Sequence, residues 1–177
     1  MTQRLNIISR PSLETTVAGM FSSLAETNTF HGVLAHLSEF MSSTITCLHA
    51  EEFEQRNSRL VTAGGVPESE FSRIASDYAQ RWGAENPWIA GSLPSLRDKG
   101  YEHGEAVISS RELESTGFYT HFLKPLGIKY GMGIHVWSDN PSNMALATLH
   151  RSPSCSGFDE EDLRRVESIR PYLVSAY

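Results

Sequence analysis

The chain has 177 residues, of which 40% are hydrophobic and 20% are charged, a composition typical of a globular protein with a filled core. Its net charge of −6 disfavours direct binding to nucleic acid or to an anionic membrane surface. No apolar run approaches the ~20 residues that cross a bilayer, and the N-terminus has no basic stretch followed by an apolar block. We therefore expect a cytoplasmic protein with no membrane partner.

Two short helices are predicted over residues 12–41, where apolar residues recur at helical spacing with a break near Asn28. β-Branched residues in segments 43–51 and 57–63 predict two paired strands. No internal repeat and no linker rich in glycine, serine or proline divides the sequence. We therefore expect residues 1–177 to form a single domain.

The middle of the chain gives weaker signals. A helix is predicted over residues 67–82, because a proline suits its first position and apolar residues form one stripe. Residues 83–104 are expected to be irregular, and 106–109 is a candidate short strand. Helix fragments are expected to follow, broken at Gly117 and ending before Pro125.

A β-hairpin is the clearest local prediction. Segments 131–137 and 144–150 are rich in strand-forming residues, and Ser-Asp-Asn-Pro-Ser-Asn between them favours a turn. Together with the earlier strands, the hairpin predicts an α+β fold in which residues 43–152 form a sheet and pocket region.

The C-terminal segment, residues 158–177, is predicted to be a long amphipathic helix. Asp159 is placed to cap its N-terminus, with Asp162 at the third helical position. Pro171 removes a backbone donor inside this helix, so a bend near Arg170 is expected.

The order of these features resembles the end of a GAF domain. The resemblance covers residues 126–177: a glycine-bearing strand, a turn, a strand ending in Leu-His-Arg, and Phe-Asp-Glu-Glu-Asp-Leu opening a helix. It implies a GAF/PAS-like central antiparallel sheet with helices on both faces. The segment Ile-Arg-Pro-Tyr-Leu resembles the connector between such a sensor and the helix-turn-helix domain of LuxR-type transcriptional regulators. Residues 158–177 would then be an output helix, with DNA contacted only through a domain not present in this chain.

Strand alternation in the hairpin predicts two different faces. One face is apolar and comprises Met132, Ile134, Val136, Ala145, Ala147 and Leu149. The other is mixed and comprises Gly131, Gly133, His135, Trp137, Met144, Leu146, Thr148 and His150. Small-molecule sites are mostly apolar with a few polar groups, so the mixed face is the candidate floor of a pocket, although it also fits simple packing against helices.

The expected ligand-binding residues come from this face and from aromatic segments nearby. Two tryptophans, with a tyrosine beside them, are candidates for a lid over the pocket, and two phenylalanines lie on a stretch that borders the pocket in GAF domains. The full set is Tyr78, Trp82, Trp88, Phe118, Phe122, His135, Trp137 and Thr148.

Catalytic and metal-binding motifs are absent from the sequence. It contains no H-E-x-x-H, G-x-S-x-G, P-loop or G-x-G-x-x-G motif. Cys47 and Cys155 form no C-x-x-C pair, so neither a disulfide framework nor a zinc site is predicted. We therefore expect no enzyme activity, no cofactor and no metal.

The sequence as a whole favours a small-molecule-sensing domain of a transcriptional regulator that signals through its C-terminal helix. The resemblance also implies a homodimer. Three alternatives stay open: an acyl-homoserine-lactone receptor domain, a dimerisation module without ligand, and a thiol-dependent GAF enzyme. Asn86 stands before Pro87 where the lactone receptors carry an acidic residue.

Overall fold

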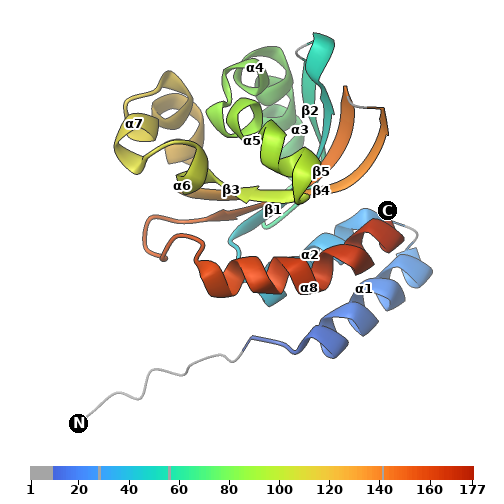
Figure 1. Ribbon diagram of the computed structural model, residues 1–177. Coiled ribbons are helices and arrows are strands. Elements are labelled where there is room, and N and C mark those ends of the chain that lie inside the picture. Colours follow the sequence, from blue (N-terminus) through green and yellow to red (C-terminus); the bar gives the residue numbers. More distant parts are fainter. Residues whose placement is uncertain (1–9, 28, 56, 141) are drawn as a thin grey trace.

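A five-stranded antiparallel sheet organises the chain, with strand order β2-β1-β5-β4-β3. The computed structural model describes residues 10–27, 29–55, 57–140 and 142–177. The strands are β1 (Ile45–Glu52), β2 (Asn57–Gly64), β3 (Tyr101–His103), β4 (Tyr130–Asn140) and β5 (Asn143–Arg151). Helices cover both faces of the sheet, which confirms the predicted α+β architecture (Figure 1).

One face of the sheet is covered by the first and last helices of the chain (Figure 1). These are α1 (Leu13–Thr27), α2 (Phe30–Met41) and α8 (Glu160–Ala176). The helices occur where residues 12–41 and 158–177 predicted them, while Asn28, the expected break, lies outside the described residues. Among the described residues, none of the helices is long and apolar enough to span a membrane.

The apolar face of the hairpin packs against α2 and α8, as its alternation predicts. The core there includes Met132, Ile134, Val136, Ala145, Ala147 and Leu149, all buried together with side chains of α2 and α8. Burial of this face is the main stabilising contribution of the hairpin, since each large apolar side chain contributes about 1.5–3 kcal/mol when removed from water.

The opposite face is covered by shorter helical segments (Figure 1). Between β1 and β2 the chain forms a separate 3₁₀ turn, η1 (Phe53–Gln55). The segments that cover this face are α3 (Glu68–Asp77), the π-helix η2 (Tyr78–Trp82), α4 (Gly83–Glu85), α5 (Pro87–Asp98), α6 (Gly104–Val107), α7 (Ser110–Glu114), the π-helix η3 (Tyr119–Leu123) and the 3₁₀ turn η4 (Lys124–Leu126). Their buried side chains form a second core with β1 and β2. We refer to them together as the central helices.

Two predictions for the middle of the chain are wrong. Residues 83–104 are not irregular, because Asn86 caps the N-terminus of α5 by accepting the backbone N–H of Trp88 at 3.0 Å. Burial of Trp88 and Leu96 outweighs the low helix propensity of the glycine, serine and proline within α5. Residues 106–109 are not a strand; α6 ends at Val107, and the next two residues are extended without sheet partners among the described residues.

The hairpin forms as predicted, but its turn is tighter than expected. The strands continue to Asn140 and from Asn143, so Ser138, Asn140 and Asn143 of the expected loop are paired. Its register shifts between His135 and Trp137, which is a β-bulge. The helix fragments were expected to end before Pro125, but they continue through it, because η4 accommodates this proline in its first turn.

The C-terminal helix α8 begins at a capping box. The Asp159 carboxylate accepts the backbone N–H groups of Glu161 and Asp162, both at 3.0 Å, and Asp162 in turn accepts the N–H of Asp159 at 3.2 Å. The helix runs continuously through Pro171 to Ala176. It is fixed to the sheet by Arg170, whose Nε donates to the His135 carbonyl at 3.1 Å.

Candidate functional site

Strands β1 and β5 lie side by side and direct alternate residues toward the central helices. Their pairing places Cys47 opposite Thr148 and His49 opposite Leu146. Residues two apart on a strand share a face, so Cys47 and His49 point to the same side as Thr148 and His150. The result is a row of polar side chains under the central helices.

Two small cavities lie between this row and the central helices. Their volumes are about 40 Å³ and about 30 Å³. Both cavities are large enough for water but much smaller than typical small-molecule sites of about 300–1,000 Å³. The side chains that line both cavities, and so separate them, are His49, Asn86, Trp88 and His150.

Aromatic rings make up much of the first cavity. Phe118 stacks on Phe122 with ring centres 5.6 Å apart, and Tyr78 lies 5.6 Å from Phe122. Trp88 stacks over His150 at 6.1 Å and meets Phe118 edge-on at 6.3 Å. Aromatic pairs in these arrangements stabilise a core beyond their area burial, so the cavity has well-packed walls.

The position of Trp88 depends on two glycines. A Cβ atom at Gly131 would lie 2.8 Å from the Trp88 ring, and one at Gly104 would lie 2.5 Å from its indole nitrogen. Only the absence of these side chains lets the indole lie flat against β4. Gly131 lies on the strand face that was expected to form the pocket floor, and the Trp88 indole occupies the space next to it.

A buried polar network closes the far side of the cavities. The Ser58 hydroxyl donates to Glu51 at 2.5 Å, and the Asn86 amide donates to the Tyr78 hydroxyl at 3.0 Å. Burial is the main reason that the pKa of Tyr78 is raised, so its phenol stays protonated at neutral pH. Because the Asn86 side chain also caps α5, its amide oxygen and nitrogen both have partners within the chain.

The two histidines that line both cavities, His49 and His150, lack some of the hydrogen bonds that their ring nitrogens could form. Neither ring nitrogen of His49 has a hydrogen-bond partner, although Nδ1 lies 3.4 Å from Glu51. The His150 Nε2 pairs with the Thr148 hydroxyl at 3.1 Å, but its Nδ1 has no partner. Burial lowers the pKa of His150 to about 3, so the ring is neutral at neutral pH. Buried polar atoms are usually paired, so these nitrogens stand out.

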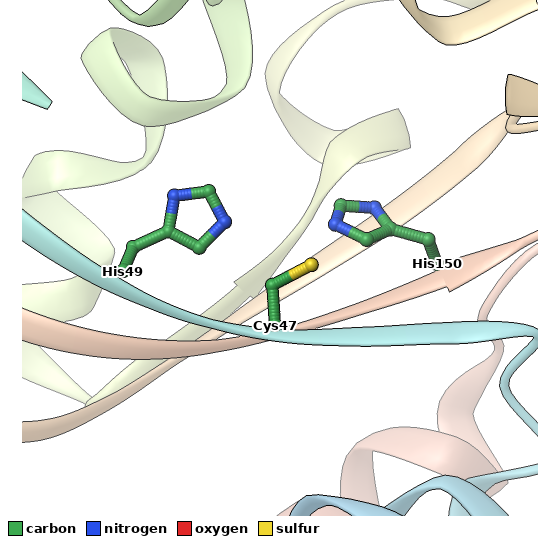
Figure 2. A group of neighbouring side chains, drawn as sticks. All are labelled: Cys47, His49 and His150. Atoms are coloured by element: carbon green, nitrogen blue, oxygen red, sulfur yellow. The ribbon is translucent and has the colours of Figure 1, made fainter. Parts of the chain in front are cut away.

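Cys47 lies beside the two histidines, and the three side chains project from the sheet on the same side (Figure 2). Burial raises the pKa of the Cys47 thiol to about 12, partly offset by a hydrogen bond with Thr148. A thiol must lose its proton to act as a nucleophile. The free Cys47 side chain is therefore poorly suited to the thiol-dependent catalysis that the sequence left open.

The structure brings five of the eight expected ligand-binding residues to the cavities: Tyr78, Trp88, Phe118, Phe122 and Thr148. Trp82 is buried just behind them, with its ring centre 6.4 Å from that of Phe118 and 6.2 Å from that of Phe122. His135 lies on β4 outside the cavity lining, where its backbone N–H donates to the Gly100 carbonyl.

The expected position of Trp137 on the pocket face is wrong. The bulge at Val136 adds one residue to β4, so Trp137 pairs with Ala145 and turns to the face that α8 covers. There its ring lies 6.1 Å from that of Tyr177, and the side chain is 46% exposed.

The expected ligand-binding set did not include Cys47, His49, His150 or Asn86, although His150 was placed on the mixed face of the hairpin. The signal for the first two was the spacing Cys-x-His in a predicted strand, which puts both side chains on one face. The missing information was that β5 pairs with β1, since this pairing alone brings His150 to them.

Comparison with solved structures identifies the fold. The ligand-binding domain of VqsR from Pseudomonas aeruginosa is similar over 92% of both chains, with 14% identity and a TM-score of 0.72. The N-acylhomoserine-lactone-dependent LuxR-family factor CepR2 from Burkholderia cenocepacia is similar over 93% of this chain and 92% of its own, with 16% identity and a TM-score of 0.61. A GAF domain of a phosphoenolpyruvate-protein phosphotransferase from Coxiella burnetii matches over 93% and 91%, with 10% identity and a TM-score of 0.56.

The chain has a GAF-like fold. This confirms the fold that the end of the sequence resembles. No protein-family model and no curated protein matches the sequence.

Proposed function

We propose that this chain is the small-molecule-sensing domain of a LuxR-type transcriptional regulator, and that it binds its ligand between the sheet and the central helices. The observation that carries the proposal is the pair of aromatic-lined cavities with unpartnered histidine nitrogens in their shared wall. Apolar walls with a few fixed polar groups are characteristic of small-molecule sites. The similar ligand-binding domains of VqsR and CepR2 support this proposal.

The lining defines the kind of ligand. Tyr78, Phe118 and Phe122 offer aromatic surface to an apolar or aromatic group. His49 and His150 offer ring nitrogens that have no partner in the chain, so a ligand with one or two hydrogen-bonding groups would satisfy them. We therefore propose a compact ligand that is largely apolar with one polar end.

Entry of such a ligand requires Trp88 to move. The two cavities are too small for it separately, and Trp88 lies in the wall between them. Rotation of this indole away from His150 would join them into one space. Trp88 thus takes the role of an internal gate in this proposal, rather than that of an outer lid.

The output in this proposal passes through β5 to α8. His150 faces the cavity, and the next residue, Arg151, lies on the other face and binds Asp162 in the first turn of α8. A ligand that displaces the His150 side chain would shift this strand end and, with it, the start of α8. Such coupling requires the ligand to bind one arrangement more tightly than the other.

Assembly and DNA binding complete the proposed function. We propose a homodimer formed through α1 and α8, which pack side by side. Phe21 of α1, Val174 of α8 and Tyr177, directly after α8, are exposed apolar residues there. DNA would be contacted through a separate helix-turn-helix domain joined to α8. In this role the chain binds and signals, and it catalyses no reaction.

A thermal-shift experiment tests ligand binding. Indole, phenylacetate and N-hexanoyl homoserine lactone serve as probes at millimolar concentration, with the wild type and Ala63→Phe compared. Ala63 lines the first cavity, so phenylalanine there would fill it, whereas Ala84→Phe changes an exposed alanine and is the control. Stabilisation of the wild type and Ala84→Phe, but not of Ala63→Phe, supports the proposal. Equal shifts in all three, or no shift with any probe, overturns it.

A further inference from the structure

Three polar side chains follow one another on the cavity face of β1. Cys47, His49 and Glu51 are two residues apart, so they share a face, and they are only 6%, 3% and 3% exposed. His150 of the neighbouring strand β5 joins them and is 9% exposed. Such a concentration of polar groups in an otherwise apolar interior is costly unless the groups are paired.

The two imidazoles are incompletely hydrogen-bonded among the described residues. Both ring nitrogens of His49 and Nδ1 of His150 make no hydrogen bond. One ligand-type atom from each of Cys47, His49 and His150 lies within 4.8 Å of the other two (Figure 2). Groups that normally coordinate metals are therefore clustered and buried at one place, and three of the four imidazole nitrogens have no hydrogen bond.

The His49 imidazole has the outer contact of a metal-bound histidine. His150 turns its Nε2 toward Cys47 and His49 (Figure 2), and this nitrogen pairs with the Thr148 hydroxyl at 3.1 Å, a contact that a bound metal would replace. The His49 Nδ1 lies 3.4 Å from the Glu51 carboxylate, which leaves Nε2. Metal-ligating histidines typically pair their second nitrogen with a carboxylate or another polar group, which fixes the ring orientation.

We propose that Cys47, His49 and His150 form a binding site for one Zn²⁺ ion. The donor set of one sulfur and two imidazole nitrogens suits zinc. It does not suit Mg²⁺, which prefers oxygen ligands. The Glu51 carboxyl group lies beside the site, 3.4 Å from His49 Nδ1, so an acidic group stands next to the proposed cation in the apolar interior.

Binding follows a defined chemical step. The Cys47 thiol forms a sulfur–zinc bond and releases its proton to solvent, while each histidine coordinates as a neutral imidazole. Bond lengths of about 2.0–2.3 Å place the ligand atoms of a tetrahedral site about 3.5 Å apart, so the three side chains close in by about 1 Å. The adjoining cavities give them room to do so.

The site forms from these three side chains without an organic ligand, but it shares His49 and His150 with the proposed ligand pocket. With zinc bound, a ligand would therefore meet the ion and not the two ring nitrogens. All three line the first cavity. The fourth tetrahedral position of the zinc ion would therefore be left to water or to a small donor molecule, as in zinc sites that keep an open position.

Cobalt substitution tests the site directly. Untagged, reduced protein is titrated with Co²⁺, and the expected result is a near-ultraviolet thiolate-to-cobalt absorption at one ion per chain, displaced by Zn²⁺. Cys47→Ser should abolish this absorption, and His150→Gln should weaken binding at least tenfold. The matched controls are Cys155→Ser and His31→Gln, which change an exposed cysteine and an exposed histidine and should leave the titration unchanged.

A second variant guards against loss of folding. Glu51→Gln keeps all three ligands and removes the carboxylate next to His49, so we expect a 10–100-fold loss of zinc affinity with the cobalt absorption retained. Zn²⁺ should also raise the melting temperature of the wild type. Absence of the thiolate absorption in folded wild type, or its loss in Cys155→Ser rather than Cys47→Ser, overturns the site. Failure of the organic probes alone would not affect this result.

Discussion

The Arg151 guanidinium binds the Asp162 carboxylate through two hydrogen bonds, from Nη1 at 2.8 Å and from Nη2 at 2.9 Å. Both side chains are buried, and Nη2 of Arg151 also donates to the Met41 carbonyl at 2.6 Å. The pair joins the end of β5, the end of α2 and the first turn of α8. It therefore holds the proposed output helix to the strand that carries His150.

Removal of one partner from this pair should destabilise the whole chain. Asp162→Ala leaves the buried Arg151 charge without its carboxylate, and we expect a loss of about 3–5 kcal/mol in the free energy of unfolding. Urea denaturation followed by circular dichroism measures it. Asp139→Ala changes an exposed aspartate and should alter stability by less than about 0.5 kcal/mol. If Asp162→Ala and Asp139→Ala both lowered the free energy of unfolding by the same small amount, the Arg151–Asp162 pair would not contribute to stability.

The same pair predicts a pH dependence of stability. Burial opposes ionisation of Asp162, but the hydrogen bonds and charge of Arg151 outweigh it and hold the pKa of this carboxyl below its ordinary value. The unfolded chain then binds the proton more readily, so the contribution of Asp162 is complete above about pH 4 and is lost as the pH falls further.

Urea midpoints measured from pH 6 to pH 3 check this dependence. The wild type should lose stability toward the acidic end more steeply than Asp162→Asn, which has no proton to bind at this position. Parallel curves for the two proteins would mean that the shifted pKa of Asp162 contributes nothing.

Gly131 and Gly133 provide a matched test of how Trp88 is held. A Cβ at Gly131 would lie 2.8 Å from the indole, whereas a Cβ at Gly133 would make an ordinary 3.7 Å contact with Leu96. We expect Gly131→Ala to cost about 1–3 kcal/mol and to change tryptophan fluorescence, because the ring must shift. Gly133→Ala, on the same strand, should leave the fluorescence unchanged. Equal behaviour of the two variants would refute the close packing of Trp88 on β4.

The sequence predicted the outer layers of this fold better than its middle. Periodicity was strong in the segments that became α1, α2 and α8, and alternation was clear in the hairpin, since each of these elements has one face on a single core. The segment that became α5 lacks such a pattern, because Trp88 and Leu96 are buried while glycine, serine and proline interrupt its stripe. Its helix-start signal, Asn86 before Pro87, was present and was not recognised.

The candidate site could likewise be predicted only in part from the sequence. Aromatic residues of the central helices line the cavity, as predicted from their aromatic character and, for Phe118 and Phe122, from the resemblance to GAF domains. Trp137 does not reach the cavity, because a single-residue bulge turns the end of β4 so that this side chain lies on the other face. No local sequence pattern predicts such a bulge. The cluster around Cys47 depends on the non-local pairing of β1 with β5, which sequence periodicity does not encode.

The proposed dimer predicts a position-dependent effect of charge. Val174 on α8 is 43% exposed and Val61 on β2 is 50% exposed, so the two valines are matched in exposure. Val174→Glu should shift the chain from dimer to monomer in analytical ultracentrifugation, because a carboxylate would be buried in the interface without a partner. Val61→Glu should remain dimeric. Dissociation by Val61→Glu alone would place the interface elsewhere, on β2.

The most direct test of the sensing role is native mass spectrometry of the chain purified from the cells that naturally produce it. We predict a discrete added mass on the wild type that is released by collisional activation and is absent from Ala63→Phe, whose cavity is filled. Only the unliganded mass in the wild type, or the same added mass on both proteins, would contradict ligand binding between the sheet and the central helices.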